Sequence, residues 1–137
     1  MADLGCLADG YALEFSQLGF ETTGIEVRNS NCAACNFVKP HTNQLNLTFI
    51  KDDAWNVGDH GPFGAVFCCG LVYHIDRPKL FIDTMARTTK RVLIIQVHFS
   101  VDDFYARTRI LRPKIFFRKW VDEPTGLDWL CVHQVEK

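Results

Sequence analysis

The sequence predicts an α/β fold, in which a doubly wound, mostly parallel sheet ends in a C-terminal antiparallel hairpin. Short β-like runs alternate with helical patterns as far as residue 97, and the run at 91–97 (RVLIIQV) is typical of a strand covered on both faces. Two further β-like runs near the C-terminus flank a turn. We therefore expect a single α/β domain over residues 1–137.

Composition and length agree with one globular domain. The chain has 137 residues, of which 47% are hydrophobic and 23% are charged. This is enough apolar material for one core and argues against disorder. The longest uncharged apolar stretch, residues 65–72, is far shorter than the roughly 20 residues of a membrane helix. Because the first residues also lack a basic leader and an apolar segment, we expect a cytoplasmic protein with no membrane partner.

The repeating units are expected in a fixed order along the chain. The predicted strands are residues 2–4, 22–27, 47–50, 65–69 and 91–97. The predicted helices are residues 11–18, 31–38 and 78–86. Gly19 suits a helix stop, Ser30 suits a helix cap, and Pro78 suits a first helical turn. Between the third and fourth strands, the sequence VGDHGPFG predicts a loop.

The C-terminal part predicts an antiparallel hairpin. Residues 115–121 and 128–135 both have the pattern of strands, and the turn-forming sequence EPTG lies between them at 123–126. We expect this hairpin to complete the sheet.

The six cysteines are expected to be thiols and not disulfides, since they lie in apolar or helical stretches. Cys32 and Cys35 form a CxxC pattern, but a single CxxC supplies only half of a zinc site. The favoured interpretation is two small apolar residues one helical turn apart. Cys68 and Cys69 are expected inside a strand, and no metal site is predicted.

A basic stretch occupies residues 104–121, which hold six Lys or Arg side chains and no acidic one, interleaved with aromatic residues. Such a segment can meet phosphates by charge and bases by stacking. A solvated surface with aromatic residues in the core explains the same pattern and is favoured. Nucleic acid is therefore a partner that the sequence permits without favouring.

The connection between the first strand and the first helix carries most of the chemical information. Asp3, Gly5 and Gly10 lie in this connection, where a doubly wound sheet binds its nucleotide-like ligand. Glu26 ends the next strand, 21 residues after Gly5, and a carboxylate there can accept hydrogen bonds from ribose hydroxyls. An exposed turn glutamate is the alternative, and the spacing favours the ribose role.

Acidic residues around this connection restrict the class of ligand. Asp3 and Asp9 repel a pyrophosphate, and no GxGxxG motif is present, so a nicotinamide-dependent oxidoreductase is disfavoured. The third strand ends at Asp52 and Asp53. The Asp53 carboxylate can accept from the amine of adenine, while the Ala54 N–H can donate to a ring nitrogen. A solvated acidic turn is the competing explanation.

Together, the strand-end sequence at 3–6 (DLGC), Glu26, Asp53 with Ala54, and the sequence CCG at 68–70 resemble the class I S-adenosylmethionine-dependent methyltransferases. The resemblance covers roughly residues 2–98 and implies a Rossmann-like fold, methyltransferase activity and S-adenosyl-L-methionine as cofactor. It implies cofactor contacts from Asp3, Gly5, Cys6, Leu7, Gly10, Glu26, Val27, Asp53, Ala54, Cys69 and Gly70.

The sequence departs from the family pattern at several positions. Leu7 and Asp9 stand where the loop usually has glycines, and Gly64 stands where an acidic residue is usual. Only Met1 and Ala2 precede Asp3, so a shortened N-terminus is expected. An incomplete sheet of this kind would favour self-association.

The catalytic candidates follow the fourth strand. His74 can take a proton from an O or N nucleophile, and Tyr73 precedes it. A histidine that merely packs at the substrate entrance is equally compatible, and His98 is a weaker candidate. The sequence does not identify the methyl acceptor. The alternative function is a catalytically silent relic of the same fold, which would bind the cofactor or a partner without transferring a methyl group.

Overall fold

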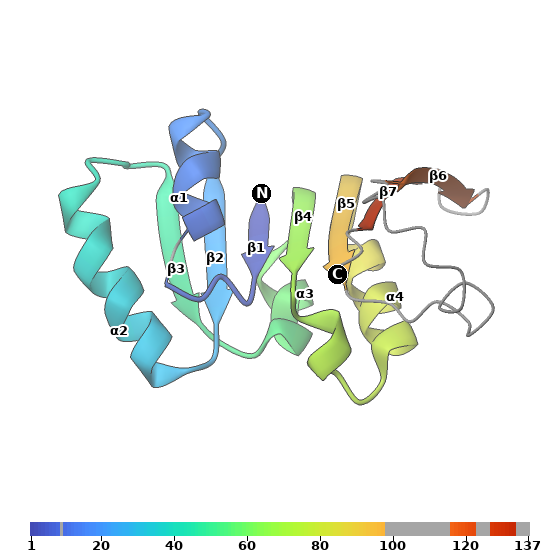
Figure 1. Cartoon of the computed structure of the whole chain (residues 1–137). Helices are drawn as coiled ribbons and strands as arrows, with labels where there is room; N and C mark the ends of the chain where they lie inside the picture. Colours follow the sequence, from blue (N-terminus) through green and yellow to red (C-terminus); the bar gives the residue numbers. More distant parts are fainter. Residues whose placement is uncertain (9, 98–115, 123–126, 134–137) are drawn as a thin grey trace, which may run out of the picture.

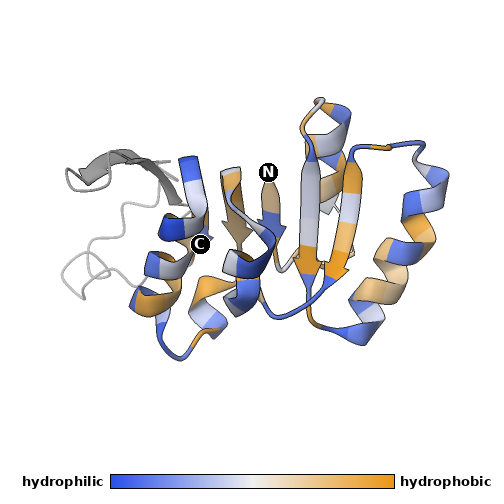
Figure 2. Ribbon diagram, turned by 180° about the vertical axis from the view of Figure 1, so that it is seen from behind, coloured by the Kyte–Doolittle hydropathy of each residue, from blue (hydrophilic) through white to orange (hydrophobic). Residues whose placement is uncertain are grey.

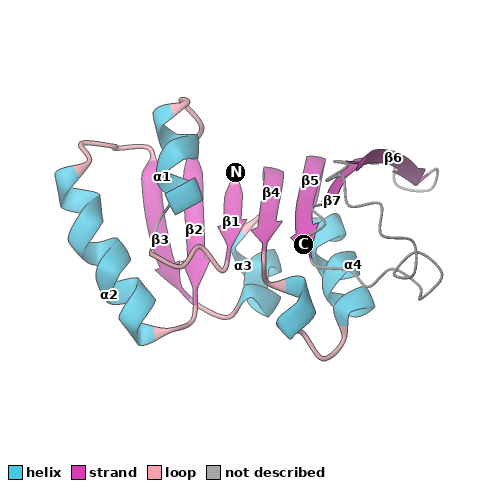
Figure 3. Cartoon of the chain, in the orientation of Figure 1, coloured by secondary structure: helices cyan, strands magenta, loops and turns pink. Residues whose placement is uncertain are grey.

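The computed structural model describes residues 1–8, 10–97, 116–122 and 127–133, the last two ranges for their backbone only. Strands and helices alternate through the first five strands (Figures 1 and 3). The strands are β1 (Ala2–Leu4), β2 (Thr22–Glu26), β3 (Leu47–Lys51), β4 (Phe63–Cys69), β5 (Thr89–Val97), β6 (Phe116–Asp122) and β7 (Leu127–His133). The helices are α1 (Gly10–Gln17), α2 (Asn29–Val38), α3 (Val57–His60) and α4 (Pro78–Thr88). Three short 3₁₀ turns are η1 (Lys39–His41), η2 (Ala54–Asn56) and η3 (Val72–His74).

The strands form one sheet in the order β3-β2-β1-β4-β5-β7-β6. Neighbours among β1 to β5 are parallel, and β7 pairs in parallel with β5. The predicted α/β fold with a Rossmann-like, mostly parallel sheet is therefore confirmed. At the sheet's edge, β6 runs antiparallel to β7, with Phe116 opposite His133 and Asp122 opposite Leu127.

The order of the strands reverses between β1 and β4. From β1 the chain proceeds outward through β2 to β3, then returns to β4 on the other side of β1. In doubly wound sheets this reversal opens a crevice beyond the carboxyl ends of the strands. These ends lie at the lower edge of the sheet in Figure 1.

Two apolar clusters cover the two faces of the sheet. One is centred on Phe81 and Met85 of α4, Val57 of α3 and the strand residues Leu4 and Ile25. The other joins Cys6, Ala12, Cys35 and Leu47, which brings α1 and α2 together. Figure 2 views the face that bears α3 and α4, whose surfaces carry both hydrophilic and hydrophobic residues. Burying the hydrophobic stripes against the sheet fixes where each helix begins and ends relative to the strands.

The structure corrects two local predictions. Ser30 does not cap α2, because the helix begins two residues earlier, with Arg28 in the cap position and no side-chain cap. The Arg28 N–H instead donates to the Glu26 carboxylate, 2.8 Å away, which supports this earlier start. The sequence VGDHGPFG is also not simply a loop: α3 occupies its first four residues and β4 begins at Phe63. Val57, the first residue of α3, is fully buried in the core, which anchors this short helix.

No helix in the described part of the chain has both the length and the apolar character needed to cross a membrane.

Candidate functional site

The loop between β1 and α1 turns sharply at the reversal point of the sheet. Gly5 has φ +67°, and an added Cβ there would lie 3.3 Å from the Leu71 side chain. The N–H groups of Gly5 and Cys6 both donate to the Ile25 carbonyl, at 2.9 and 3.3 Å. Leu7 follows with φ 54°, a left-handed conformation that side chains other than glycine rarely adopt. This loop is therefore anchored to the end of β2.

Glu26 provides the principal side-chain link between that loop and β2. It is 5% exposed, and its carboxylate accepts from the Leu7 N–H at 3.1 Å and from the Arg28 N–H at 2.8 Å. Each carboxylate oxygen has further lone pairs, so Glu26 can still accept from a ligand hydroxyl. Val27, directly after it, exposes 56% of its surface beside this carboxylate.

Asp3 lies at the centre of β1, between β2 and β4, and is almost completely buried. Burial raises the pKa of Asp3 to about 7, and the Ala12 N–H acts in the opposite direction. Its Oδ2 atom has no hydrogen-bond partner among the described residues. A buried carboxylate oxygen without a partner is costly, and a cationic group would remove that cost. Asp3 therefore fits a ligand that ends in an ammonium group.

The charge of Asp3 influences thiol and phenol groups on neighbouring elements. Burial, followed by the Asp3 carboxylate, raises the pKa of Cys68 to about 12. The pKa of Tyr11 is also raised, first by Cys69 and also by Asp3. Tyr11 packs against Phe67 of β4, with ring centroids 4.9 Å apart. The sequence-based set omitted Tyr11, although its place in the first turn of α1 was a usable signal.

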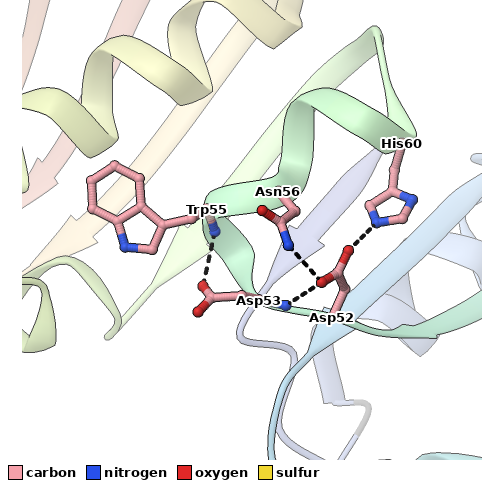
Figure 4. A network of polar contacts seen from close by, with 5 residues as sticks. All are labelled: Asp52, Asp53, Trp55, Asn56 and His60. Atoms are coloured by element: carbon pink, nitrogen blue, oxygen red, sulfur yellow. Dashed lines mark hydrogen bonds and ion pairs between the residues drawn. The ribbon is translucent and has the colours of Figure 1, made fainter.

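The third strand ends in two aspartates with different environments (Figure 4). Asp52 accepts from the Asn56 amide at 2.8 Å, the Asp53 N–H at 2.7 Å and His60 Nε2 at 2.7 Å. The Asn56 and His60 hydrogen bonds lower the pKa of Asp52. Asp52 thus fastens η2 and α3 to β3.

Asp53 is exposed and caps η2, where its Oδ1 accepts from the Trp55 N–H at 3.0 Å. In Figure 4 its second oxygen points away from the Asp52 cluster. Trp55 holds this turn against α4 through an edge contact with Phe81. The Asp53 carboxylate is therefore exposed on a fixed turn, directly before the buried Ala54.

The end of β4 supplies a second sharp turn. Gly70 has φ +68°, and its N–H donates to the Gln96 carbonyl at 3.0 Å. An added Cβ on Gly70 would lie 3.2 Å from the Tyr73 hydroxyl. The Cys69 thiol donates to Gln96 Oε1 at 3.3 Å, which links β4 to β5.

Tyr73 and His74 follow this turn in η3 and contact each other in a tilted arrangement, with ring centroids 4.3 Å apart and an interplanar angle of 54°. Tyr73 is 46% exposed and His74 is exposed as well. The two side chains are accessible from solvent on the same edge of the sheet as the ligand-facing turns.

Three sequence-based candidates lie outside the residues whose side chains are described. These are Asp9, His98 and the basic stretch at 104–121. Gly10 opens α1 directly after Asp9. The described residues contain no cluster of three or more His, Cys, Asp or Glu side chains that would hold a metal ion.

The sequence matches the family model of a methyltransferase domain over residues 2–94. No curated protein matches it.

Solved structures share the fold. The N-terminal domain of EvdMO1 with SAH bound matches with 23% identity and a TM-score of 0.66, over 95% of this chain and 58% of that one. A structure of EvdMO1 matches with 29% identity and a TM-score of 0.59, over 64% of this chain and 22% of that one. Magnesium protoporphyrin IX methyltransferase (ChlM) from Synechocystis PCC 6803 with bound SAM matches with 21% identity and a TM-score of 0.61, over 69% of this chain and 46% of that one. The chain thus spans between about a fifth and three fifths of the length of these proteins.

The family match covers the five parallel strands almost completely and includes both turns and both buried carboxylates of the site. The chain belongs to the methyltransferase domain family, in the class I group whose cofactor is S-adenosyl-L-methionine.

Proposed function

We propose that this chain transfers a methyl group from S-adenosyl-L-methionine to an oxygen or nitrogen atom of an acceptor molecule. The observation that carries the proposal is the pair of buried carboxylates, Asp3 and Glu26, on neighbouring parallel strands at the reversal point of the sheet. Their acidity suits a ligand that carries an ammonium group and ribose hydroxyls, whereas it would repel a pyrophosphate.

Each part of the cofactor has a proposed set of partners. Asp3 and the backbone of the loop would receive the methionine end, with the carbonyl of Cys69 or Gly70 facing its ammonium group. Glu26 would accept from the ribose hydroxyls, and Val27 would offer apolar surface beside the adenine. Asp53 would accept from the adenine amine while the Ala54 N–H donates to a ring nitrogen. The loop residues in this set are Gly5, Cys6, Leu7 and Gly10.

The cofactor, when bound, supplies a methyl group already activated as a sulfonium. The protein's own task is therefore to orient the acceptor and to exclude water. An imidazole nitrogen of His74 would take the proton that the O–H or N–H nucleophile loses. Tyr73 would position His74, because the two rings are in contact, with centroids 4.3 Å apart.

Calorimetry with S-adenosylhomocysteine (SAH) tests the binding step. Glu26→Ala should weaken SAH binding by at least tenfold, since two backbone N–H groups and the ribose lose their acceptor. The matched control is Glu14→Ala on the exposed surface of α1, which should bind SAH as the wild type does. Equal affinity of the Glu26→Ala and wild-type chains would contradict the proposed site.

Transfer of a labelled methyl group to a panel of hydroxyl and amine acceptors tests the reaction. His74→Ala should lower the rate at least tenfold with little effect on SAH affinity, whereas the exposed control His41→Ala should leave both unchanged. An RNA acceptor would show itself through binding that weakens steeply with salt. Equal rates for His74→Ala and the wild type would remove the proposed base.

A specific observation favours the second candidate, a silent cofactor-binding or partner-binding relic. Tyr73 is nearly half exposed and His74 is exposed, so the described residues do not exclude water from this side of the site. SAH binding without transfer to any acceptor in the panel would support the relic and contradict the enzyme.

We also propose that β6 and β7 act as the C-terminal hairpin of one domain spanning residues 1–137. The antiparallel register of the two strands supports this, although the family match ends at residue 94. Amide exchange that protects β7 together with β5 is the expected result, and independent exchange would contradict it.

A further inference from the structure

Two thiols on α2 hold the backbone of two residues in the cofactor site. The Cys32 thiol donates to the carbonyl of Glu26 at 3.2 Å. The Cys35 thiol, one helical turn later, donates to the carbonyl of Leu7 at 3.1 Å. The helix therefore touches both the end of β2 and the loop after β1 through sulfur.

The Leu7 contact supports a strained residue. Leu7 adopts φ 54°, and its N–H is bound by Glu26 while its carbonyl accepts from Cys35. A left-handed leucine persists where its surroundings hold it in place. Both polar backbone atoms of Leu7 are held in this way, so the loop conformation depends in part on the Cys35 thiol.

Cys32 is the accessible member of the pair. It is half-buried and lines a pocket of about 150 Å³. The other lining residues are Glu26, Cys35, Asn36, Phe49, Ile50 and Lys51. The Lys51 ammonium suits a small anionic thiol reagent such as glutathione. Cys35 is only 1% exposed, and the neighbouring Cys6 is buried with its pKa raised by that burial, so neither is an entry point for an oxidant.

We propose that Cys32 and Cys35 form a redox-sensitive latch that controls cofactor binding: as thiols they hold the site, and as a disulfide they release it. This inference rests on the proposed function, because the affinity under control is that for S-adenosyl-L-methionine.

The oxidant is a low-molecular-weight disulfide of the glutathione class. The Cys32 sulfur gives up its proton and attacks one sulfur of glutathione disulfide, which breaks the S–S bond and releases one glutathione thiol. The deprotonated Cys35 sulfur then attacks the Cys32 sulfur, and the second glutathione leaves as a thiol. The two cysteines lose two electrons and two protons, and glutathione disulfide gains both to become two thiols.

Oxidation removes both contacts with the site. A disulfide has no S–H, so the carbonyls of Glu26 and Leu7 both lose their donors. In addition, helical side chains three residues apart have Cβ atoms about 5–6 Å apart, whereas a disulfide requires about 3.5–4.5 Å. Closing the bridge must tighten this turn of α2, which draws both sulfurs away from the loop and from β2.

The test uses the full chain equilibrated in reduced or oxidised glutathione. Alkylation followed by peptide mass spectrometry maps the disulfides, calorimetry measures SAH affinity, and amide exchange follows the Leu7 N–H. The oxidised chain should contain a Cys32–Cys35 bridge and bind SAH about tenfold more weakly, since each hydrogen bond contributes a factor of roughly 2 to 10. Its Leu7 amide should exchange faster, and a thiol reductant should reverse all three changes.

Variants separate the latch from other thiol chemistry. Cys32→Ala should bind SAH with the same affinity in reduced and in oxidised glutathione. Cys131→Ala in β7 should lose SAH affinity in oxidised glutathione as the wild type does. A Cys6–Cys35 bridge, unchanged affinity after oxidation, or a Cys32→Ala chain that still responds would each overturn the proposal. If the reduced chain fails to bind SAH, the proposed function fails instead. The disulfide map and the Leu7 exchange rate then still decide whether the latch exists.

Discussion

The Glu26 carboxylate accepts a hydrogen bond from the backbone N–H of Leu7 at 3.1 Å, although the two residues are 19 positions apart. The second oxygen of the same carboxylate accepts from the Arg28 N–H. Glu26 therefore holds the loop after β1 and the start of α2 at the same time, independently of any ligand.

Glu26→Gln should destabilise the chain by about 1–3 kcal/mol, because an amide offers one acceptor oxygen in place of two and leaves a buried N–H without a partner. Chemical denaturation measures the change. Glu14→Gln, an exposed substitution on α1, should change stability by less than about 0.5 kcal/mol. Equal stability of the two variants would show that the Glu26 hydrogen bonds contribute nothing.

The buried Asp3 carboxyl predicts how stability depends on pH. Its folded pKa, raised to about 7, exceeds its unfolded pKa, so the folded chain binds more protons between these values. The contribution is fully present below the unfolded pKa near 3.9 and is lost as pH rises to about 7. The loss is on the order of 4 kcal/mol. Asp3→Asn should flatten the slope between pH 4 and 7, whereas the exposed control Asp59→Asn should keep it. If the unfolding free energy of Asp3→Asn still falls with pH as it does in the wild type, another titratable group causes the pH dependence.

Cofactor binding should release a proton from Asp3. Near pH 6 the folded chain holds this carboxyl mostly protonated, and an ammonium group beside it would favour the ionised form. Calorimetry of SAH binding in two buffers with different protonation enthalpies should therefore report close to one proton released per SAH. Asp3→Asn should abolish the difference between buffers. If Asp3→Asn releases as many protons as the wild type when SAH binds, the methionine end of SAH does not lie beside Asp3.

Close packing at Gly24 links β2 to the cofactor loop. A Cβ there would lie 2.7 Å from Phe49 Cδ1 and 2.8 Å from Cys6 Sγ. Gly24→Ala should therefore cost about 1–3 kcal/mol of unfolding free energy. The control is Gly64→Ala in β4, where nothing lies within 4 Å of the added Cβ, and it should not destabilise. Equal denaturation midpoints for the two variants would refute the clash.

The sequence predicted the parts of this fold that depend on pattern. The β-branched run of β5 and the alternation of strands and helices predicted the five parallel strands and the position of Glu26 at the end of β2. Asp3, expected in the connection after the first strand, lies instead at the centre of β1. The start of α2 was not predictable from Ser30, because the interaction that supports the start is a contact with Glu26. The supporting role of Cys35 was invisible for a similar reason: a small residue on an apolar helix face carries no sign that its thiol meets a carbonyl 28 residues away. The Cys35–Leu7 contact joins distant segments, and local propensity does not encode such a contact.

Leu7 provides the clearest case of local strain in the site. Its φ of 54° costs a leucine roughly 1–2 kcal/mol relative to the right-handed region, whereas glycine adopts it freely. Glycine also raises the conformational entropy of the unfolded chain, which offsets part of the stabilisation obtained by relieving the strain. Leu7→Gly should therefore raise the free energy of unfolding by up to about 1 kcal/mol, since the side chain is 59% exposed and little packing is lost.

Leu18→Gly is the matched control. Leu18 is 73% exposed and is not in the left-handed region, so the substitution relieves no strain. It should lower the free energy of unfolding by about 0.4–1 kcal/mol. Thermal and chemical denaturation give both values, and a loss of stability in Leu7→Gly equal to that in Leu18→Gly would mean that the loop holds Leu7 without strain.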